Sequence, residues 1–499
     1  MNDMRFTIYV NDATTVLTHS PDGWQDMVTK LERSETYYGM LNEYSVNLKF
    51  PKEGAEQIRQ AFYTELWYTI PTIKIERLDK FTGQYVEIVT LEFDMATFED
   101  YHTYIQCTCI KGGLARLLKV NGSTEFTVGE ITTDRFRFYR PALTTRDVEY
   151  YTLSRVAELL FAKLIDGGSY AIDTTLLDDY DATMVLTTGR AIREQSVGDV
   201  QLTFEQFFKI INAIKPIGIK IEDVGGTETL IFVDRPDLYD STTDIDTVEL
   251  GENFQVKLHQ ANIARYFELG YDTQDYEDAT SIRYEIAVTS KFKVDIPNLT
   301  NVMDLKCPIR ADVYGMYDIW DTAEGNEDAL FLVCVYDDPS SIYLTPEPGT
   351  TTDISDPAIA AYNVRISPRR LLQAHKPWID CMAWPLFGSQ CNFVSGGLNI
   401  ANLTTDLTTE LSNVYAEGVG FELEEPTIFK PVLFVIDATV DSDFYDKVKA
   451  NPYGVVTFAY EGNNYRGFVQ NLSYKMYGSK YISVDLLCTF DTDLTKLIR

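Results

Sequence analysis

The sequence predicts a mostly β, multi-domain protein with α+β insertions and a small β unit, a barrel or sandwich, at each end. Three observations support this class. Aromatic residues make up 13% of the chain, with 32 Tyr and 27 Phe, which favour strands. Short alternating apolar runs bounded by turn residues recur along most of the 499 residues. The two ends also share one layout: a strand, a short helix and three strands joined by tight turns.

The first β unit is expected over residues 1–135. Its strand SVNLKF precedes a helix over 54–65, which places Ala55, Ile58 and Phe62 on one face. The alternating runs TIKIERL, QYVEIVTLEF and HTYIQCTCI follow as three strands. Before this set, Gly39 is expected to mark a hairpin turn.

An α/β insertion is expected over 136–246, because the apolar period changes there from two to 3.6. Residues 147–166 read as the strongest helix, with Thr144 and Asp147 as its capping box. A second helix follows, capped by Thr203 and Gln206. The strands IGIKIED and TLIFVD flank a Gly-Gly turn after it.

The rest of the chain is expected to form a β-rich middle domain, 247–400, and a C-terminal β unit, 401–499. The middle domain contains the runs KLHQANIARYFELGY, SIRYEIAV and ALFLVCVYD, a polar linker or loop at 337–357, and a helix in ISPRRLLQAH. In the last unit the strand PVLFVI, the helix SDFYDKVKAN and the strands VVTFAY, YRGFVQNLSYKM and YISVDLLCTF repeat the order of the first unit.

The charge of the chain disfavours general binding to nucleic acid. It carries 75 acidic and 43 basic side chains, a formal charge of -32, and such a field repels phosphate backbones and anionic membranes. If the protein surrounds DNA, its acidity would line a non-adhesive passage; the alternative is that it keeps a large protein soluble. No apolar run approaches the ~18 residues of a membrane helix, so we expect no membrane span. The N-terminus MNDMRFTIYV lacks a secretory signal, which indicates a cytosolic product.

Neither the cysteines nor the histidines form a catalytic or metal-binding pattern. The seven cysteines show no disulfide framework, and the C-x-C pair Cys107 and Cys109 lies on a predicted strand, so we expect reduced, buried thiols. No two of the four histidines are spaced as metal ligands, and His102 is expected on a strand beside aromatics; the four are His19, His102, His259 and His375. The HExxH, GxSxG, P-loop and GxGxxG patterns are absent. We therefore assign no catalytic, cofactor-binding or metal-binding residue.

Clusters of acidic residues could serve a glycosidase, because that chemistry uses paired carboxylates. The candidates are Asp178, Asp179 and Asp181, and Glu422, Glu424 and Glu425. A third group, Asp240, Asp244 and Asp246, could chelate calcium but lacks the DxDxDG loop pattern. With 75 acidic residues such neighbours arise by chance, and solvated faces are the simpler interpretation.

One basic and aromatic cluster could hold single-stranded nucleic acid or a carboxylate-bearing partner. It consists of Arg135, Arg137 and Arg140 interleaved with Phe136, Phe138 and Tyr139. Strand alternation places the first two arginines opposite both phenylalanines. An ordinary amphipathic strand therefore explains the cluster equally simply.

Three stretches carry a resemblance to a known class: DGWQDMVTKLERSETYYGMLNEYSVNLKFPKEGAEQIRQAFY, NVRISPRRLLQAH, and VKANPYGVVTFAYEGNNYRGFVQNLSYKMYGSKYISVDLL. On these, the chain resembles tail hub or baseplate-type proteins of phages that infect Bacteroidetes hosts, crAss-like or related. In central hubs of this kind, two tube-like β-barrel domains in one chain let fewer subunits match a sixfold ring. The resemblance implies that the two end units are tail-tube-like modules. They share arrangement but little residue identity.

The resemblance implies a non-enzymatic virion protein without cofactors: a tail hub, baseplate or adaptor subunit, assembled in the host bacterial cytoplasm. It would form a homo-oligomeric ring around the DNA passage, without specific DNA binding, and contact tube, fibre or adaptor proteins. Sheets that continue across subunits would satisfy their edges, and Tyr and Phe would supply interface area. The alternative is a carbohydrate-binding or glycan-degrading tail component, which exposed aromatics such as Trp378, Trp384 and Tyr453 would favour. A free cytosolic enzyme would need a recognisable nucleophile, metal set or phosphate loop.

Overall fold

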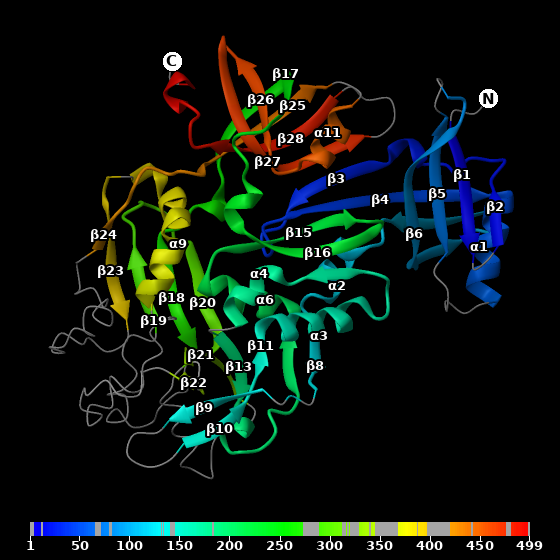
Figure 1. The fold of residues 1–499 in the computed structure, drawn as a ribbon. Helices are drawn as coiled ribbons and strands as arrows, with labels where there is room; N and C mark the ends of the chain where they lie inside the picture. The colour runs from blue at the N-terminus through cyan, green and yellow to red at the C-terminus, as the bar shows by residue number, and fades with distance from the viewer. Residues whose placement is uncertain are drawn as a thin grey trace.

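The computed structural model shows a multi-domain, mostly β protein in which helices pack on several sheets (Figure 1). The predicted fold class is therefore confirmed. The structure describes the chain except residues 1–3, 11–12, 65–70, 79–81, 131, 133, 140–144, 182–183, 273–288, 312–315, 317–318, 320–328, 339–340, 345–367, 387, 397–419, 441–442, 476–480 and 498–499. In the described part, no helix is both long and apolar enough to cross a membrane.

The N-terminal module is a curved sheet that wraps around one helix. Its elements are β1 (Met4–Val10), β2 (Ala13–Val16), β3 (Val28–Arg33), β4 (Met40–Pro51), α1 (Lys52–Thr64), β5 (Thr72–Leu78), β6 (Tyr85–Asp100) and β7 (Tyr104–Ile110), with the short η1 (Trp24–Asp26). The strands pair in the order β2-β1-β5-β6-β7-β4-β3. Ala55, Ile58 and Ala61 of α1 are buried, as helical spacing predicts, while Phe62 is half-buried and stacks on Phe98.

A bidentate ion pair fixes the turn between β6 and β7. Arg59 of α1 donates from Nε and Nη2 to the two Asp100 carboxylate oxygens at 2.9 and 2.8 Å, and also to the His102 carbonyl. The His102 amide in turn donates to Asp100, and His102 adopts a φ of 63°. The expectation that His102 lies on a strand is thus wrong, because the chain reverses at this residue.

This ion pair predicts an acid-sensitive contribution to stability. The hydrogen bonds from Arg59 lower the pKa of Asp100 to about 2, from 3.8. Because the folded pKa is the lower one, the stabilisation is present above about pH 4 and is lost as the pH falls towards 2. We expect Asp100→Asn to cost about 1 kcal/mol at pH 7 and only a small fraction of that at pH 2. Denaturant unfolding at the two pH values measures this difference, and an equal cost at both would contradict it.

The C-terminal module is a closed five-stranded barrel. It contains β25 (Phe429–Thr439), α11 (Phe444–Ala450), β26 (Val455–Tyr460), β27 (Asn463–Lys475) and β28 (Tyr481–Thr489), and β17 (Asp244–Leu258) completes it. β17 pairs with both β26 and β25, and β28 pairs with both β25 and β27, so the ring of strands closes. One strand of this barrel therefore comes from outside the predicted C-terminal range 401–499.

The two modules share one topology, as the repeated layout predicts. In the first, β4-α1-β5-β6-β7 follow in sequence and pair as β5-β6-β7-β4; in the second, β25-α11-β26-β27-β28 pair as β26-β27-β28-β25. The modules differ in the strand added beside β5 or β26. β1 runs antiparallel to β5, whereas β17 runs parallel to β26.

An α/β unit lies between the two modules in the chain. Its elements are α2 (Leu114–Asn121), β8 (Glu125–Val128), β9 (Arg135–Tyr139), β10 (Thr145–Glu149), β11 (Tyr151–Thr152), α3 (Leu153–Ile165), β12 (Ala171–Asp173), α4 (Thr175–Asp181), β13 (Met184–Thr188), α5 (Gly189–Ile192), β14 (Val200–Thr203), α6 (Phe204–Ile214), β15 (Ile217–Val224), β16 (Thr227–Asp234) and η2 (Arg235–Leu238). The helices cover one large apolar cluster that extends to β13 and β21. The predicted capping box of Thr203 and Gln206 is confirmed.

The predicted helix over 147–166 is too long at its start. Residues up to Glu149 pair with β9 as strand β10, and the helix begins at Leu153. Its cap is Thr152, whose side chain accepts a hydrogen bond from the Arg155 amide, so the predicted capping box at Thr144 and Asp147 is wrong. The apolar residues between 148 and 153 fit both periods, and pairing with β9 decides between them.

The middle of the chain contributes most strands of an 11-stranded sheet, which also includes β9, β10, β11 and β13 of the α/β unit and has one long helix against it. Its further elements are η3 (Gln260–Asn262), β18 (Tyr266–Asp272), β19 (Thr289–Lys293), β20 (Val302–Arg310), β21 (Leu330–Asp338), β22 (Ser341–Leu344), α9 (Pro368–Met382), η6 (Trp384–Leu386), β23 (Gln390–Gly396) and β24 (Gly420–Glu422); η7 (Leu494–Leu497) ends the chain's described part. The predicted linker over 337–357 begins as β21 and β22, and the rest of it lies outside the described residues, as does SIRYEIAV.

Candidate functional site: the joint between the two modules

The N-terminal module joins the barrel by direct strand pairing. β3 runs antiparallel to β27, with five residue pairs from Glu32 opposite Asn471 to Val28 opposite Lys475. A single 12-stranded sheet therefore runs through both modules, and Figure 1 shows β3 and β4 extending from the N-terminal module towards β27. The joint uses backbone groups that would otherwise form an open edge on β27.

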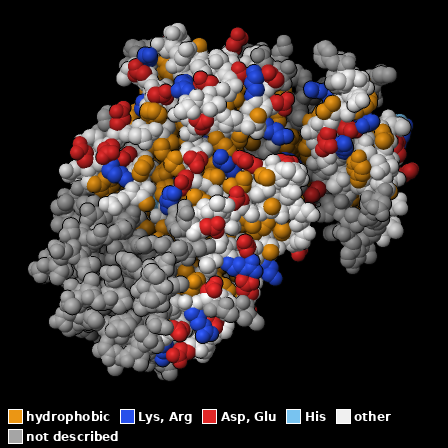
Figure 2. Space-filling view, viewed as in Figure 1, with side chains coloured by type: hydrophobic (Ala, Val, Ile, Leu, Met, Phe, Trp, Pro, Cys, Tyr) orange, Lys and Arg blue, Asp and Glu red, His pale blue; other side chains and the backbone are white. Residues whose placement is uncertain are grey.

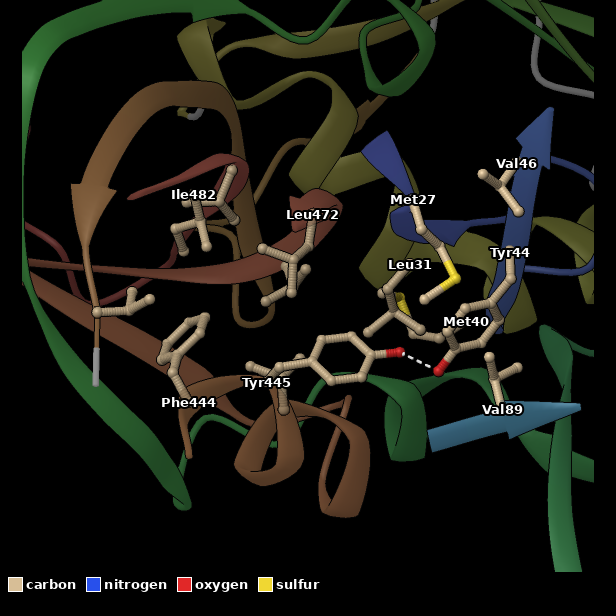
Figure 3. Close-up of a cluster of buried hydrophobic side chains, with 14 of the residues drawn as sticks. Met27, Leu31, Met40, Tyr44, Val46, Val89, Phe444, Tyr445, Leu472 and Ile482 are labelled. Atoms are coloured by element: carbon tan, nitrogen blue, oxygen red, sulfur yellow. Dashed lines mark hydrogen bonds between the residues drawn. The ribbon is translucent and has the colours of Figure 1, made fainter. Parts of the chain in front are cut away.

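The joint has an apolar core drawn from both modules (Figure 3). Leu31, Met40 and Tyr44 come from the β3–β4 hairpin, and Tyr445 and Leu472 come from the barrel. The hydroxyls of Tyr44 and Tyr445 are 2.8 Å apart and hydrogen-bonded. Burial raises the pKa of Tyr445, so its phenol stays neutral at physiological pH. Buried apolar contacts and one satisfied polar pair thus fix the register of this joint.

A buried arginine anchors the end of β3. Arg33 is 6% exposed, and its Nη1 donates to the Leu238 and Tyr38 carbonyls at 2.9 and 3.1 Å. Its guanidinium also lies over the Tyr239 ring, 4.3 Å from the centroid. Since Leu238 ends η2 of the α/β unit and Tyr239 follows it directly, Arg33 connects the hairpin to a third part of the molecule.

The turn of the β3–β4 hairpin inserts into the α/β unit. Tyr37 packs against Phe204 and Phe208 of α6, with ring centroids 6.2 and 5.2 Å away. The Ile219 amide of β15 donates to the Tyr37 carbonyl at 3.0 Å. One turn therefore contacts the barrel, the α/β unit and its own module.

A second buried cation lies beneath this turn. Arg235 is 1% exposed, donates to the Ile217 carbonyl and to Asn212, and lies 3.6 Å from the Tyr38 ring centroid. Next to it, His375 of α9 is fully buried, with Nε2 3.1 Å from the Ala213 carbonyl. Burial, together with the charge of Arg235, lowers the pKa of His375 to about 3. A neutral imidazole that donates to a carbonyl is a structural group here rather than a base.

A cavity of about 660 Å³ lies beside the joint, between the hairpin, the barrel and the middle domain. Arg33, Gln470 and His259 line it, and their atoms Nη2, Nε2 and Nδ1, in that order, are buried without a hydrogen-bond partner. The same lining contains carboxylates, namely Glu32, Glu35, Asp304 and Asp485. Because both charge signs meet there, net charge alone does not select one class of ligand.

The structure does not bring the histidines together. His375 is buried, and burial lowers the pKa of His259 at the cavity. His102 lies in the β6–β7 turn, and His19 pairs with Glu53 at 3.1 Å on the surface. Among the described residues, no three His, Cys, Asp or Glu side chains are grouped to hold a metal ion.

The acidic clusters are surface groups with separate partners. Asp244 pairs with Arg466 at 3.1 Å, Asp246 pairs with Lys447 at 2.9 Å, and Asp240 accepts hydrogen bonds from Thr242. Asp178 is exposed on α4, while the side chains of Asp179 and Asp181 lie outside the described residues. Glu422, Glu424 and Glu425 are exposed, and Glu424 lies 3.4 Å from Lys376. Figure 2 shows acidic and basic side chains interspersed over the visible face.

The basic and aromatic cluster belongs to strand β9. Arg135 is exposed and pairs with Glu149 at 2.9 Å, while Phe136 is buried, which is the alternation of an amphipathic strand. The side chains of Arg137, Phe138, Tyr139 and Arg140 lie outside the described residues.

The aromatic residues that would favour a glycan-binding role are not exposed. Trp378 is 3% exposed and Tyr453 is 8% exposed, so the expectation for both is wrong. Trp378 contacts Tyr239 and Phe429 inside the core, and Trp384 is half-buried beside Lys430. Trp378 fills the space between the barrel and α9, and Tyr453 lies at the joint, where its hydroxyl accepts from the Met40 amide, so neither ring offers a platform to a sugar.

Six cysteines are free and buried, as predicted; they are Cys107, Cys109, Cys307, Cys381, Cys391 and Cys488. Burial raises the pKa of Cys107 and of Cys381 to about 11. The thiolate fraction at pH 8 is then about one in a thousand. We expect these six thiols to resist a disulfide reagent in the native state and to react within minutes in strong denaturant. Rapid native reaction of more than one thiol per chain would contradict this.

The residues that make the joint were not among the predicted candidates. No sequence motif marks Arg33 or Arg235. The one available signal is the alternation of residues along β3, where Thr29, Leu31 and Arg33 lie on one face and Lys30 and Glu32 on the other. That alternation places Arg33 on the buried face, but it does not say what covers the face.

No family model and no curated protein matches the chain. Among solved structures, it is similar to the prophage MuSo2 43 kDa tail protein from Shewanella oneidensis, with 8% identity, a TM-score of 0.38, and 98% and 100% of the two chains covered. It is similar to the tail protein from Neisseria meningitidis MC58, with 9% identity, a TM-score of 0.38, and 97% and 96% covered. It also matches a chain of the phage P2 baseplate, with 8% identity and a TM-score of 0.26, over 98% and 100%.

Proposed function

We propose that the protein is a structural subunit of a phage tail: a hub, baseplate or adaptor protein that forms a ring around the DNA passage. The observation that carries this proposal is the joint between two modules of equal topology in one chain. The chain contains two copies of one module, and these copies pair edge to edge. A single chain therefore already contains one of the contacts that a ring of such modules needs. Further copies can extend the same contact until the ring closes.

The physical requirements of such a ring are present in the described part of the chain. The joint is a continuous sheet with a buried aromatic and aliphatic core, which is stronger than a contact between polar surfaces. The net charge of -32 repels the phosphate backbone, which suits a passage through which DNA moves without binding. Asp240, Asp244, Asp246 and His375, which the sequence singles out, each have a hydrogen-bond or ion-pair partner in the fold, which supports a structural role for these groups.

The remaining assignments follow from this proposal. The protein would lie in the virion tail after assembly in the host bacterial cytoplasm, and its partners would be itself and the tube, fibre or adaptor proteins. We keep the division at 135, 246 and 400 as a proposal for units of the chain, with α2 and β8 packed into the α/β unit and β17 exchanged into the last unit. A Bacteroidetes-infecting, crAss-like or related phage remains the proposed source.

The oligomeric state tests the proposal directly. Native mass spectrometry and negative-stain imaging should show closed rings, either of the protein alone or after addition of neighbouring tail proteins. A chain that stays monomeric with every neighbour, and that retains or cleaves glycans, would overturn the proposal in favour of a carbohydrate-directed tail component.

A further inference from the structure

We propose that the cavity beside the joint binds a small organic carboxylate, with its charged group at two buried arginines and its apolar body along the rest of the wall. The cavity lies between the β3–β4 hairpin, the barrel and the middle domain, and its volume is about 660 Å³. Ligand sites in proteins commonly have such volumes and lie where structural units meet. The inference concerns a single chain and does not depend on the proposed ring.

Two buried cations in the lining lack an anionic partner. Arg33 and Arg235 are 6% and 1% exposed, and both line the cavity. Among the described residues, their hydrogen bonds go to backbone carbonyls and to the Asn212 amide oxygen, all of which are neutral. The guanidiniums lie over aromatic rings, 4.3 Å from the centroid of Tyr239 and 4.8 Å from that of Trp378. Because a bonded anion stabilises a buried cation most, this part of the lining favours an anionic ligand.

An unpartnered donor of the barrel lies beside Arg33. Gln470 is 9% exposed, and its Nε2, like Nη2 of Arg33, is buried without a hydrogen-bond partner. Gln470 occupies the irregularity of β27, where the pairing with β28 shifts between Val469 and Asn471. Arg33 Nε lies 3.4 Å from the Val469 carbonyl, which places the guanidinium next to this irregularity. A bulge redirects a side chain out of the regular pattern, and here two N–H donors remain for the two oxygens of one carboxylate.

The charges of the lining are separated by depth. The carboxylates of Glu32, Glu35 and Asp304 are exposed, whereas both guanidiniums are buried. The fourth acid, Asp485, is half-buried and has the Asn471 side chain as a hydrogen-bond partner. Exposed acids repel a ligand with several negative charges, such as a nucleotide or a phosphate monoester. The arrangement therefore favours a ligand with a single negative charge.

The rest of the lining is apolar and includes side chains that can adapt. Ile263, Ala264 and Phe429 are at most 2% exposed, and Met303 and Met382 lie beside them in the lining. The cavity is much larger than a carboxylate group, so most of a ligand that fills it would contact these apolar side chains. The two donor nitrogens do not contact solvent, so the carboxylate reaches them by displacing lining side chains, and unbranched methionines shift readily.

A ligand held in this way would connect three parts of the molecule. Arg33 belongs to the hairpin, Gln470 to the barrel and Met382 to helix α9 of the middle domain. The complete lining exists only when these parts are assembled. Binding would therefore stabilise the assembled joint through linkage, and the thermal midpoint would rise with the ligand concentration.

Calorimetric titration of the full chain with octanoate at about pH 7.5 tests the inference. Octanol has the same apolar body without the charge, and octyl phosphate carries nearly two charges at this pH. Gln470→Met removes the unpartnered donor and keeps an unbranched side chain of similar length. Gln255→Met makes the same change at an exposed residue of β17 that does not line the cavity. Glu35→Gln removes one exposed negative charge from the lining.

We expect the unaltered chain to bind octanoate about tenfold more tightly than octanol or octyl phosphate. Gln470→Met should weaken octanoate binding about tenfold without lowering the thermal midpoint of the unliganded chain, because the donor that it removes has no partner. Gln255→Met should bind octanoate as the unaltered chain does. Glu35→Gln should bind it about twofold more tightly, because a repulsive charge is absent.

Absence of octanoate binding, equal binding of octanol, or equal loss of binding in the two glutamine variants would overturn the inference. Tighter binding of octyl phosphate than of octanoate would overturn the choice of a carboxylate. Since Glu35 is exposed, Glu35→Gln gives a result even if Gln470→Met does not fold, and unchanged or weaker octanoate binding in it would contradict the separation of charge. All of these outcomes leave the proposed ring to its own test.

Discussion

Leu31→Asp is expected to open the joint between the two modules, whereas Lys30→Asp is expected to leave it closed. The two residues are neighbours on β3, and Leu31 is 3% exposed while Lys30 faces solvent. Leu31 lies opposite Leu472 of β27, which is fully buried, so an aspartate there would place a carboxylate in an apolar core. We expect a cost of about 4 kcal/mol to the joint, from lost apolar burial plus desolvation of the charge.

Hydrogen exchange of individual backbone amides measures the destabilisation at the joint itself. A cost of about 4 kcal/mol lowers the protection of joint amides about a thousandfold. The loss should concentrate in β3 and in residues 471–475, because these pair with each other. The barrel amides between β25 and β28 serve as an internal control, since their pairing does not involve β3. Uniform loss of protection through the barrel, or none in β3, would contradict the assigned joint.

The local elements of both modules could be predicted from the sequence because their signals are short in range. Helix α11 and strands β26, β27 and β28 show their apolar period and turn residues within a few positions. The same holds for α1, where Ala55 and Ile58 mark the buried face. Repetition of this order at both ends was visible without any pairing information.

The joint could not be predicted, because its contacts join residues far apart in the chain. Arg33 Nε lies near the Val469 carbonyl across 436 positions, and β17 reaches the barrel from about 200 residues upstream of its partners. Periodicity gives the buried face of a strand but not its neighbour. Trp378 was expected to be exposed but is buried. A large aromatic residue can serve either as a sugar platform or as part of a core, and only the residues packed around it decide which.

Acid is expected to destabilise the protein well above the range in which its carboxylates titrate, and His375 is the reason. In the folded chain, burial and the nearby Arg235 lower its pKa to about 3, against 6.5 when unfolded. Between these values the unfolded state binds a proton that the folded state does not, so stability falls as the pH falls. The expected slope is about 1.4 kcal/mol per pH unit below 6.5.

The substitution His375→Gln separates this effect from general acid sensitivity. Glutamine can still donate a hydrogen bond to the Ala213 carbonyl, which His375 Nε2 contacts at 3.1 Å, but it does not titrate. At pH 7.5 the variant should be the less stable, because its amide fits the imidazole space imperfectly. By pH 5 the difference in unfolding free energy should shrink by about 2 kcal/mol. Only the unaltered chain loses stability on acidification through a histidine that is neutral when folded and protonated when unfolded. Denaturant unfolding of both proteins across this range measures the difference, and parallel loss of stability would show that His375 is protonated, or accessible, in the folded state.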